Sequence, residues 1–253
     1  MRISLNCPSY KRPYVETLEY LPFCKVWVDE GEYPAYKEAN PEDAQIISVP
    51  KGIQGNLCRI RNYILDTEFD NGFDVVVIID DDLKGMYRHT AAGHYGYEKK
   101  KIETDQFMDF LQHFSLLCDE FGYKFWGVNC NMDAMGYRHY TPFSTTSYIG
   151  GPFQAHLKNE LRYDESLPLK EDYDMTLQHM NKYRGALRAN MYFYNCKQSE
   201  QAGGCATYRN YEREKQQFFA LQKKWGERIV KQDKQSKKQF DYNPIIKIPI
   251  RGV

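Results

Sequence analysis

Three consecutive carboxylates, Asp80-Asp81-Asp82, follow a run of apolar residues in the segment FDVVVIIDDDL at positions 73–83. A short apolar run without alternation is typical of a strand buried on both faces. Ligands of open α/β sheets bind outside the carboxyl ends of such strands. Because alternate residues of an extended segment point the same way, Asp80 and Asp82 can face one ligand while Asp81 turns aside or reaches a ribose. Carboxylate oxygens favour Mg²⁺ or Mn²⁺ completed by phosphates and water, so we predict a metal–phosphate site rather than a helix cap or an acidic loop.

A second acidic pair, Glu171-Asp172, opens the segment EDYD, which follows the stretch LRYDE at 161–165. Taken alone, acids at a helix start favour a capping role, because a negative charge there interacts favourably with the helix macrodipole. Their place after Gly150-Gly151 and a long irregular segment also fits a general base, which must be ionised and must reach the acceptor hydroxyl. The residues alone leave both interpretations open.

A third candidate is the segment GIQGNLCRIRN at 52–62, which combines two glycines with the start of a predicted helix. The first turn of a helix offers backbone N–H groups to an anion. Arg59 and Arg61 cannot share one helical face, so at most one of them is expected to point at a phosphate. A surface salt bridge is the alternative for either arginine.

The segments that must position these residues alternate between strand and helix patterns. In the first part, strands are predicted at 2–7, 24–29, 45–49 and 74–79, and helices at 14–20, 32–39 and 56–68. Such βα units indicate a layered α/β protein with a parallel sheet. Further on we predict helices at 103–121, 171–183 and 208–231, strands at 124–130 and 187–194, an extended segment at 142–149, and loops at 85–101 and 195–204.

The bulk composition indicates a core of ordinary size and no strong overall charge. The 253 residues are 42% hydrophobic and carry no net charge, so the whole molecule shows no signature of binding to a polyanion. Residues 208–251 are an exception, with twelve Lys and Arg against five Asp and Glu. This segment is interpreted as a solvated helix face with a loose tail, or as a contact with nucleic acid or a membrane.

The cysteines and the apolar runs predict a cytoplasmic protein, in the host cytoplasm if it is encoded by a virus. Seven cysteines are scattered without CxxC spacing, and we expect them to be reduced core residues. The first residues lack the apolar region of a signal peptide, and no apolar run is long enough to span a bilayer. We therefore expect no membrane partner.

The order of these motifs resembles that of a GT-A nucleotide-sugar glycosyltransferase. The opening PSYKRP is similar to the family's P-S/T-Y-x-R start, Arg61-Asn62 precedes the acidic strand, and Asp80-Asp81-Asp82 stands where the family has its DxD motif. The segments RYDE and EDYD look like the family's R-F-D-E and E-D-x-D, so that the resemblance covers about residues 1–195. Within this fold, PSYKRP, RIRNYIL, IIDDDL and the Gly203-Gly204 loop look most similar to the TET-associated glycosyltransferases, which are linked to sugar addition on hydroxymethylated pyrimidines in virus DNA.

The resemblance implies an α/β fold of the GT-A type, with a Rossmann-like, mostly parallel sheet flanked by helices. This domain would span residues 1–205, and a basic, helical C-terminal segment, 206–253, would pack on it or extend from it. The implied activity is metal-dependent transfer of a hexose or pentose from a nucleotide-sugar, expected to be a UDP-sugar, to a hydroxyl group with inversion. The implied cofactor is Mn²⁺ or Mg²⁺.

The resemblance also assigns roles to particular residues. Asp82 would bind the cation, with Asp80 sharing it or contacting a ribose. Because no histidine follows His179, the last metal ligand would be Asn195, a water molecule or nothing. Asp172, or failing that Glu171, would deprotonate the acceptor. The nucleotide-sugar would contact a larger set, in which the last three close over the phosphates: Pro8, Ser9, Tyr10, Arg12, Asp29, Glu30, Arg59, Arg61, Asn62, Asp80, Asp81, Lys197, Gly203 and Gly204.

The acceptor expected from the resemblance is a hydroxymethylpyrimidine in phage DNA, contacted by the segment 85–101, which otherwise serves as a lid or a surface loop. A saccharide, lipid or protein hydroxyl is the alternative acceptor. The main non-enzyme alternative is a binding module for nucleotide-sugars, but such a decayed enzyme would have lost acids, and both acid pairs are intact here. Other enzyme classes fit less well: a nucleotidyltransferase would open with a Gly-rich loop, and an aspartyl phosphatase needs Thr where Lys84 stands.

Overall fold

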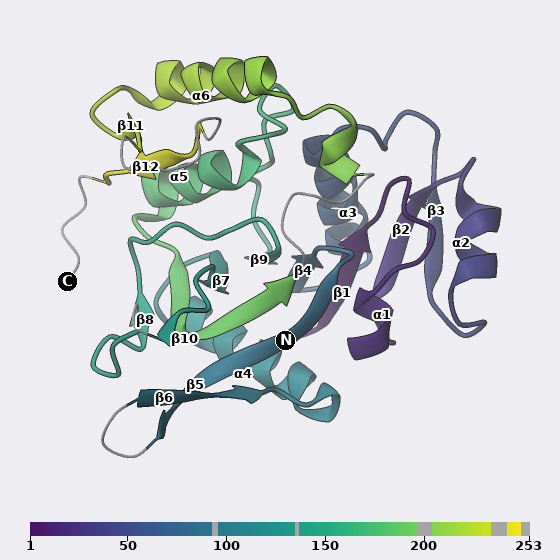
Figure 1. The fold of residues 1–253 in the computed structure, drawn as a ribbon, viewed down its shortest axis with the longest axis horizontal. Coiled ribbons are helices and arrows are strands. Elements are labelled where there is room, and N and C mark those ends of the chain that lie inside the picture. The colour runs from purple at the N-terminus through teal and green to yellow at the C-terminus, as the bar shows by residue number, and fades with distance from the viewer. Residues whose placement is uncertain (93–95, 135–136, 197–203, 234–241, 249–253) are drawn as a thin grey trace.

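The computed structural model describes the chain except for residues 93–95, 135–136, 197–203, 234–241 and 249–253. Its centre is a ten-stranded sheet with the order β3-β2-β1-β4-β9-β7-β10-β5-β6, in which β8 pairs with β10 (Figure 1). The strands are β1 (Ile3–Pro8), β2 (Lys25–Asp29), β3 (Ile46–Val49), β4 (Val75–Ile79), β5 (Leu83–Ala92), β6 (Gly96–Lys101), β7 (Phe125–Asn129), β8 (Phe143–Ser144), β9 (Phe153–Leu157) and β10 (Leu187–Cys196). The α-helices are α1 (Thr17–Tyr20), α2 (Tyr33–Ala39), α3 (Leu57–Asp70), α4 (Phe107–Glu120), α5 (Glu171–Tyr183) and α6 (Tyr211–Trp225).

Most strands of the sheet run in one direction. Strands β3, β2, β1 and β4 are parallel to their neighbours, and β10 is parallel to β7. Strand β9 lies antiparallel between β4 and β7, so β7 keeps the direction of β4. The predicted α/β class with a mostly parallel sheet is thereby confirmed.

Strand β4 explains why the apolar run ends in a site. All five of its residues are buried. Val75, Val77 and Ile79 pack in the cluster that contains α4, whereas Val76 and Ile78 pack in the cluster that contains α3 and α5. The sequence prediction of a strand buried on both faces is correct, and the next residue, Asp80, is the first that leaves the core.

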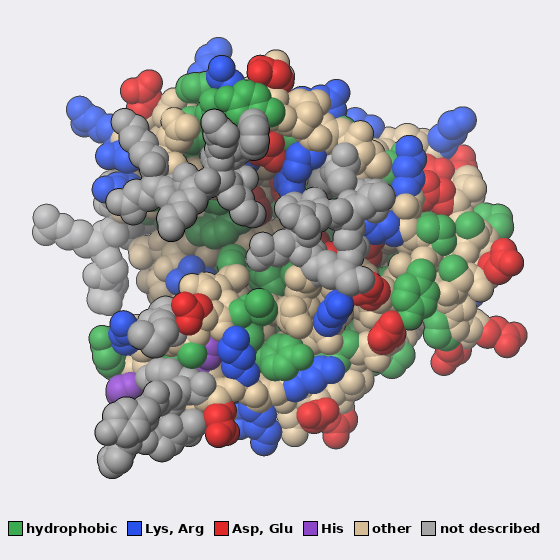
Figure 2. All heavy atoms as spheres, viewed as in Figure 1, with side chains coloured by type: hydrophobic (Ala, Val, Ile, Leu, Met, Phe, Trp, Pro, Cys, Tyr) green, Lys and Arg blue, Asp and Glu red, His purple; other side chains and the backbone are tan. Residues whose placement is uncertain are grey.

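The prediction of a loop at 85–101 is wrong, because β5 and β6 form a hairpin at the edge of the sheet. Met86 and His89 of β5 are buried, while Lys84, Arg88 and Lys100 are exposed. The segment is rich in polar residues and lacks an alternating apolar pattern, so its sequence does not indicate strands. Figure 2 shows Lys and Arg side chains gathered along the edge over β5 and β6.

The C-terminal helix is shorter than predicted and packs firmly on the sheet domain. Helix α6 starts after Asn210, whose side chain accepts from the Arg213 N–H at 3.0 Å, and ends at Gly226, which has a φ of 91°. A positive φ carries no steric cost for glycine, and Gly226 ends the helix at this point. Phe218 and Leu221 of α6 pack against Leu177 of α5. A small sheet of β11 (Val230–Gln232) and β12 (Pro244–Ile246) follows.

Two further predictions concern cysteines and membranes. Six described cysteines have free thiols, of which Cys7, Cys24, Cys58 and Cys118 are buried. Within the described residues, no helix is both long and apolar enough to cross a bilayer.

Candidate functional site

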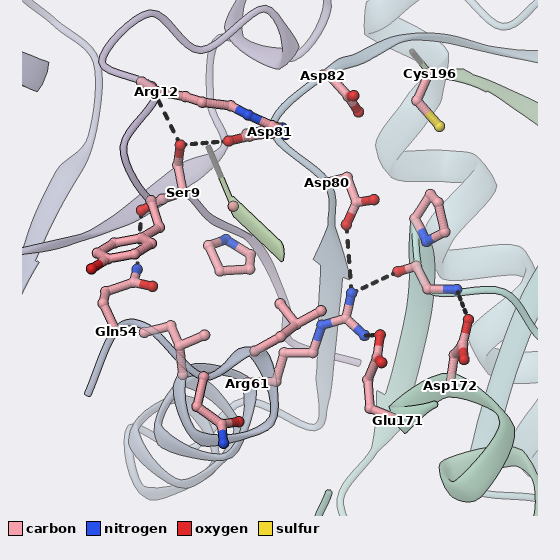
Figure 3. A pocket seen from close by; sticks show the side chains of 18 of the residues that line it. Ser9, Arg12, Gln54, Arg61, Asp80, Asp81, Asp82, Glu171, Asp172 and Cys196 are labelled. Carbon is pink, nitrogen blue, oxygen red and sulfur yellow. Dashed lines mark hydrogen bonds and ion pairs between the residues drawn. The ribbon is translucent and has the colours of Figure 1, made fainter. Parts of the chain in front are cut away.

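A cavity of about 360 Å³ opens at the carboxyl ends of β1 and β4, where most of the predicted site residues meet (Figure 3). It is lined from several segments that lie far apart in the sequence. The predicted residues among its lining are Pro8, Ser9, Tyr10, Arg12, Arg61, Asp80, Asp81, Asp82, Glu171, Asp172 and Gly204.

Asp81, the middle acid, anchors the segment that follows β1. Its carboxylate accepts from the Ser9 hydroxyl at 2.6 Å and pairs with Arg12 Nη1 at 2.8 Å (Figure 3). The Asp81 side chain is only 8% exposed, so water has little access to these charge-assisted contacts. The segment turns sharply at Lys11, a non-glycine residue with a φ of 56°. Asp81 therefore faces the protein and holds Arg12 at the cavity.

The backbone of the acidic turn is held by Thr17, the first residue of α1. Thr17 Oγ1 donates to the Asp80 carbonyl at 2.7 Å and accepts from the Leu83 N–H at 2.9 Å. The Thr17 N–H also donates to the Asp81 carbonyl at 3.2 Å. Two side-chain contacts and one backbone contact thus fix the turn that carries the three carboxylates.

Asp80 and Asp82 point into the cavity, as the alternation of an extended segment predicts. Burial, followed by the neighbouring charges of Asp80 and Asp81, raises the pKa of Asp82 to about 7. Burial also raises the pKa of Asp80, although the nearby Arg61 opposes this shift. Within the described part of the chain, no hydrogen bond occupies the Asp82 carboxylate. This acid is therefore available to a cation or to a hydrogen-bond donor of a ligand.

The guanidinium of Arg61 connects both acidic motifs. It is 1% exposed, and it lies 3.5 Å from Asp80 Oδ1 and 3.4 Å from Glu171 Oε1 (Figure 3). It also donates to the Gly151 carbonyl at 3.0 Å and to Gln154 Oε1 at 3.0 Å. Arg61 thus joins the end of β4, the turn before β9 and the start of α5. The carboxylates around it compensate its buried charge.

Asp172 is held by donors on two sides. The Tyr148 hydroxyl and the Gly151 N–H, the latter at 3.2 Å, donate to Asp172 Oδ2, and the Tyr173 N–H donates to Oδ1 at 2.8 Å. Gly151 lies directly beside both acids, since a Cβ at this position would be 3.4 Å from Glu171 Oε1 and 3.5 Å from Asp172 Oδ2. Burial and the charge of Asp172 raise the pKa of Glu171 to about 8. Glu171 is therefore largely protonated at neutral pH and poorly suited to act as a general base.

The residues present fit a divalent cation only as a partial set of ligands. Among the described residues, no group of three or more His, Cys, Asp and Glu side chains is arranged to hold a metal ion. Asp80 and Asp82 offer oxygen atoms at one side of the cavity, and Mg²⁺ commonly binds through one or two carboxylates with substrate phosphates and water. The acidic pair therefore suits a cation that arrives with a diphosphate.

Basic and aromatic residues from the C-terminal part close one wall of the cavity. Tyr208 and Arg209 line it, just before α6, and Arg209 Nε pairs with Glu214 at 2.8 Å. The Gly204 N–H donates to the Tyr10 carbonyl at 2.9 Å, which joins this wall to the segment after β1. The cavity thus presents the two guanidinium groups of Arg12 and Arg209 beside its acids.

Several predicted site residues lie outside the cavity lining. Arg59 pairs on the surface with Glu165 at 2.9 Å, and Asn62 bonds the backbone of Tyr163 at 2.7 and 2.9 Å. Asp29 accepts from the Gly31 N–H at 2.9 Å, and Glu30 follows it in the exposed turn after β2. Asn195 does not line the cavity, but its neighbour Cys196 does, next to a register shift between them. Lys197 and Gly203 lie outside the described residues.

Other site residues escaped the sequence analysis because they have no motif. Gln54 donates to the carbonyls of Ser9 and Trp27 at 3.0 and 2.9 Å and so fixes the end of β1. Tyr148 and Arg209 are recognisable only from the tertiary structure. For Gln54, the signal available in the sequence was its place between Gly52 and Gly55, both of which adopt a positive φ.

Comparison with solved structures identifies the type of fold. The chain is similar to the structure of Staphylococcus aureus TarS 1-349 in complex with UDP-GlcNAc, with a TM-score of 0.51 and 12% sequence identity over 88% of this chain and 67% of that one. TarS in complex with UDP gives a TM-score of 0.44 at 12% identity, covering 88% of this chain and 66% of that chain, and A197 from STIV gives 0.42 at 9%, covering 79% and 88%. No protein-family model and no curated protein matches the chain. The chain spans about two thirds of the TarS chain, and the likeness shows a mixed α/β sheet of the GT-A type.

Proposed function

We propose that the protein is a glycosyltransferase that moves a sugar from a nucleotide-sugar to an acceptor hydroxyl. The observation that carries the proposal is the meeting of Asp80, Asp82 and Asp172 around the buried Arg61 in one cavity. The likeness in fold to TarS, which was crystallised with UDP-GlcNAc, supports a nucleotide-sugar as the donor and a UDP-sugar as its expected form.

The donor would lie along the carboxyl end of β1 with its diphosphate toward the acidic turn. Arg12, held by Asp81, and Arg209, just before α6, would supply positive charge for the phosphates. Asp82 and Asp80 would hold Mn²⁺ or Mg²⁺, which offsets charge on the departing diphosphate as a Lewis acid. Tyr10 offers an aromatic ring at the nucleoside end of the cavity lining.

On the other side of the reacting centre, Asp172 accepts the proton of the acceptor hydroxyl. The acceptor oxygen then forms its bond to the anomeric carbon while the bond from that carbon to the phosphate oxygen breaks. The nucleoside diphosphate leaves with the bonding electrons, and the anomeric configuration inverts. Tyr148 and the Gly151 N–H keep the Asp172 carboxylate in a fixed orientation for this step.

The finer identity of the acceptor is part of the same proposal. The resemblance of PSYKRP, RIRNYIL and IIDDDL to TET-associated glycosyltransferases supports a 5-hydroxymethylpyrimidine in DNA. The exposed Lys84, Arg88 and Lys100 of the hairpin β5–β6 provide positive charge directly after the acidic turn. A base reached in this way has to leave the DNA stack first.

One assay tests the proposal. The protein is incubated with Mn²⁺, a panel of nucleotide-sugars, and plain or hydroxymethylated DNA, and the products are analysed by mass spectrometry. The expected result is a sugar mass added only to hydroxymethylated DNA, with release of nucleoside diphosphate. Donor hydrolysis without a mass shift on DNA would instead direct the search to saccharide, lipid or protein hydroxyls.

Two variants separate the parts of the mechanism. Asp82→Ala should lose turnover and metal-dependent nucleotide binding. Full activity of this variant, or full activity of the wild type in EDTA, would contradict a role for the cation. Asp172→Asn should bind the donor as the wild type does but transfer sugar about 10² to 10⁴ times more slowly. A wild-type rate in this variant would remove Asp172 as the base.

A further inference from the structure

We propose that Arg188, Tyr148 and Tyr173 form an acceptor subsite beside Asp172 that takes a nucleotide unit, with the phosphate on Arg188 and the base against the tyrosines. This inference rests on the proposed function, because it places the acceptor at the carboxylate that takes its proton. Arg188 and Tyr148 lie outside every motif of the sequence, and Tyr173 is the third residue of EDYD.

Arg188 lies on the face of β10 that turns away from α4. Its neighbours Leu187 and Ala189 are buried in the cluster that contains α4, so Arg188, between them, points to the opposite face. There its Nη1 donates to the Tyr148 carbonyl at 3.4 Å, and its Nε donates to Asn190 Oδ1 at 2.8 Å. Both of these partners are neutral.

The positive charge of Arg188 is therefore uncompensated within the described part of the chain, where no carboxylate pairs with it. The side chain is partly buried, and burial lowers its pKa. Arg61, the comparable buried arginine of this protein, is surrounded by acids instead. A half-buried guanidinium without a carboxylate partner is stabilised when a bound ligand supplies an anion. The planar guanidinium also matches the geometry of a phosphate group.

Tyr148 and Tyr173 provide an aromatic surface next to this charge. Their rings are stacked, with centroids 4.2 Å apart and an angle of 18° between the planes, and both side chains keep partial access to solvent. Tyr148 comes from the segment before Gly150 and Tyr173 from the first turn of α5. Stacked, partly exposed rings of this kind accept the flat face of a nucleobase.

The subsite is continuous with the reacting centre. The Tyr148 backbone contacts Arg188, and its hydroxyl donates to Asp172. Cys130 is within electrostatic reach of both groups: burial raises its pKa, Arg188 lowers it and Asp172 raises it. A ligand held by Arg188 and the two rings would therefore place a substituent of its base at Asp172. The combination of one anion site and one ring site fits a nucleotide better than a plain saccharide.

The test measures binding of a fluorescent single-stranded oligonucleotide that carries one 5-hydroxymethylcytosine, by fluorescence anisotropy. Arg188→Gln should weaken binding about tenfold and reduce the slope of log K against log salt by about 0.7, the value for one lost phosphate contact on a single strand. Arg188→Lys should retain most of the salt dependence. Arg2→Gln is the matched control, because Arg2 also donates to a backbone carbonyl, at 3.1 Å, but lies at the far end of β1.

An otherwise identical oligonucleotide with an abasic site in place of the modified base tests the ring site. Wild-type protein should bind it more weakly, and Tyr173→Leu should reduce the difference. Equal affinity of wild type and Arg188→Gln, with normal melting of both, would overturn the phosphate assignment, and equal affinity for both oligonucleotides would overturn the ring assignment. Binding of UDP, measured in parallel, reports on the donor side alone. Failure of the wild-type protein to bind UDP would contradict the proposed function and not the acceptor subsite.

Discussion

Arg61 and Glu171 are 110 positions apart in the sequence, yet Arg61 Nη1 lies 3.4 Å from Glu171 Oε1 in the interior of the protein. The same guanidinium also reaches Asp80, so the Arg61 side chain holds the two acidic motifs at a fixed separation. A motif search would treat these acids as independent, but the structure shows them as parts of one charge network.

This network predicts a large effect of Arg61→Met on stability. The substitution leaves the carboxylates of Asp80 and Glu171 without their buried partner, so the free energy of unfolding should fall by about 3–5 kcal/mol. The matched change Arg59→Met, on the same helix, removes an exposed ion pair and should cost less than about 1 kcal/mol. Urea unfolding followed by circular dichroism measures both values. Similar losses in the two variants would contradict a clamp at Arg61.

Asp81→Asn should change donor binding in a different way from a substitution of Asp82. Asp81 faces Ser9 and Arg12, so its loss should release Arg12 and raise the KM for the nucleotide-sugar about tenfold, with kcat retained. The response of the variant to Mn²⁺ concentration should stay that of the wild type, because Asp81 is not directed at the cation. Steady-state kinetics over a range of metal concentrations provide the check. A lost metal response would show that all three aspartates serve the cation.

Tyr148→Phe should lower the rate of transfer without weakening donor binding. The variant keeps the ring stacked on Tyr173 but removes the hydroxyl that orients Asp172, and the loss of such a contact to a charged group is worth about tenfold. Single-turnover rates and UDP affinity, measured side by side, separate the two effects. A weaker affinity for UDP at an unchanged rate would disagree with a positioning role.

The buried histidines predict a loss of stability in mild acid. Burial lowers the pKa of His179 to about 3, and burial together with His179 lowers the pKa of His156. The unfolded chain therefore binds more protons than the folded one below about pH 6.5, so stability is full above that pH and falls as the pH drops toward 3. His179→Leu should reduce the loss between pH 7 and pH 5 by about 2 kcal/mol.

The control for this experiment is His113→Leu, at an exposed position of α4. It should keep the pH dependence of the wild type. Chemical unfolding at a series of pH values gives both curves, and parallel curves for His179→Leu and the wild type would rule out His179 as the source.

Helix α6 should contribute to the stability of α5 through one buried acid. Asp174 is 1% exposed at its side chain and pairs with Lys224 Nζ at 2.8 Å and with Trp225 Nε1 at 2.8 Å. Lys224→Met should lower the free energy of unfolding by about 2 kcal/mol, less than for a fully buried pair because Lys224 is partly exposed. Lys223→Met, one position earlier and exposed, should have little effect. Thermal melts of both variants, followed by circular dichroism, provide the comparison.

The types of the chemical groups were predictable from the sequence, but their partners were not. Val75–Ile79 and the acids after it form a local pattern, and so do Glu171 and Asp172 at a helix start. The partners of Asp81 and the burial of Arg61 depend on segments tens of residues away, which no local pattern contains. The roles of Tyr148 and Arg188 are of the same kind.

The hairpin β5–β6, predicted as a loop, and β9 (Phe153–Leu157), for which no strand was predicted, both contain many polar residues. In the hairpin β5–β6, lysines cover the exposed face, and in β9 two of the buried residues are polar. Gln154 accepts from Arg61 and from the Tyr163 hydroxyl, and His156 also bonds the Tyr163 hydroxyl, at 2.8 Å. In β9, tertiary hydrogen bonds thus satisfy buried polar groups that a pattern of apolar residues would assign to the surface.

The long sequence separation of the contacts around the cavity has a consequence for the order in which the chain can fold. The contacts that build the cavity join residues 72 positions apart, as in Ser9 and Asp81, or 110 apart, as in Arg61 and Glu171. Contacts of such long range form slowly, because the intervening loops must close first. A chain that folds while it is synthesised can therefore complete β1 to β4 early, but it remains without a working site until α5 has emerged and docked.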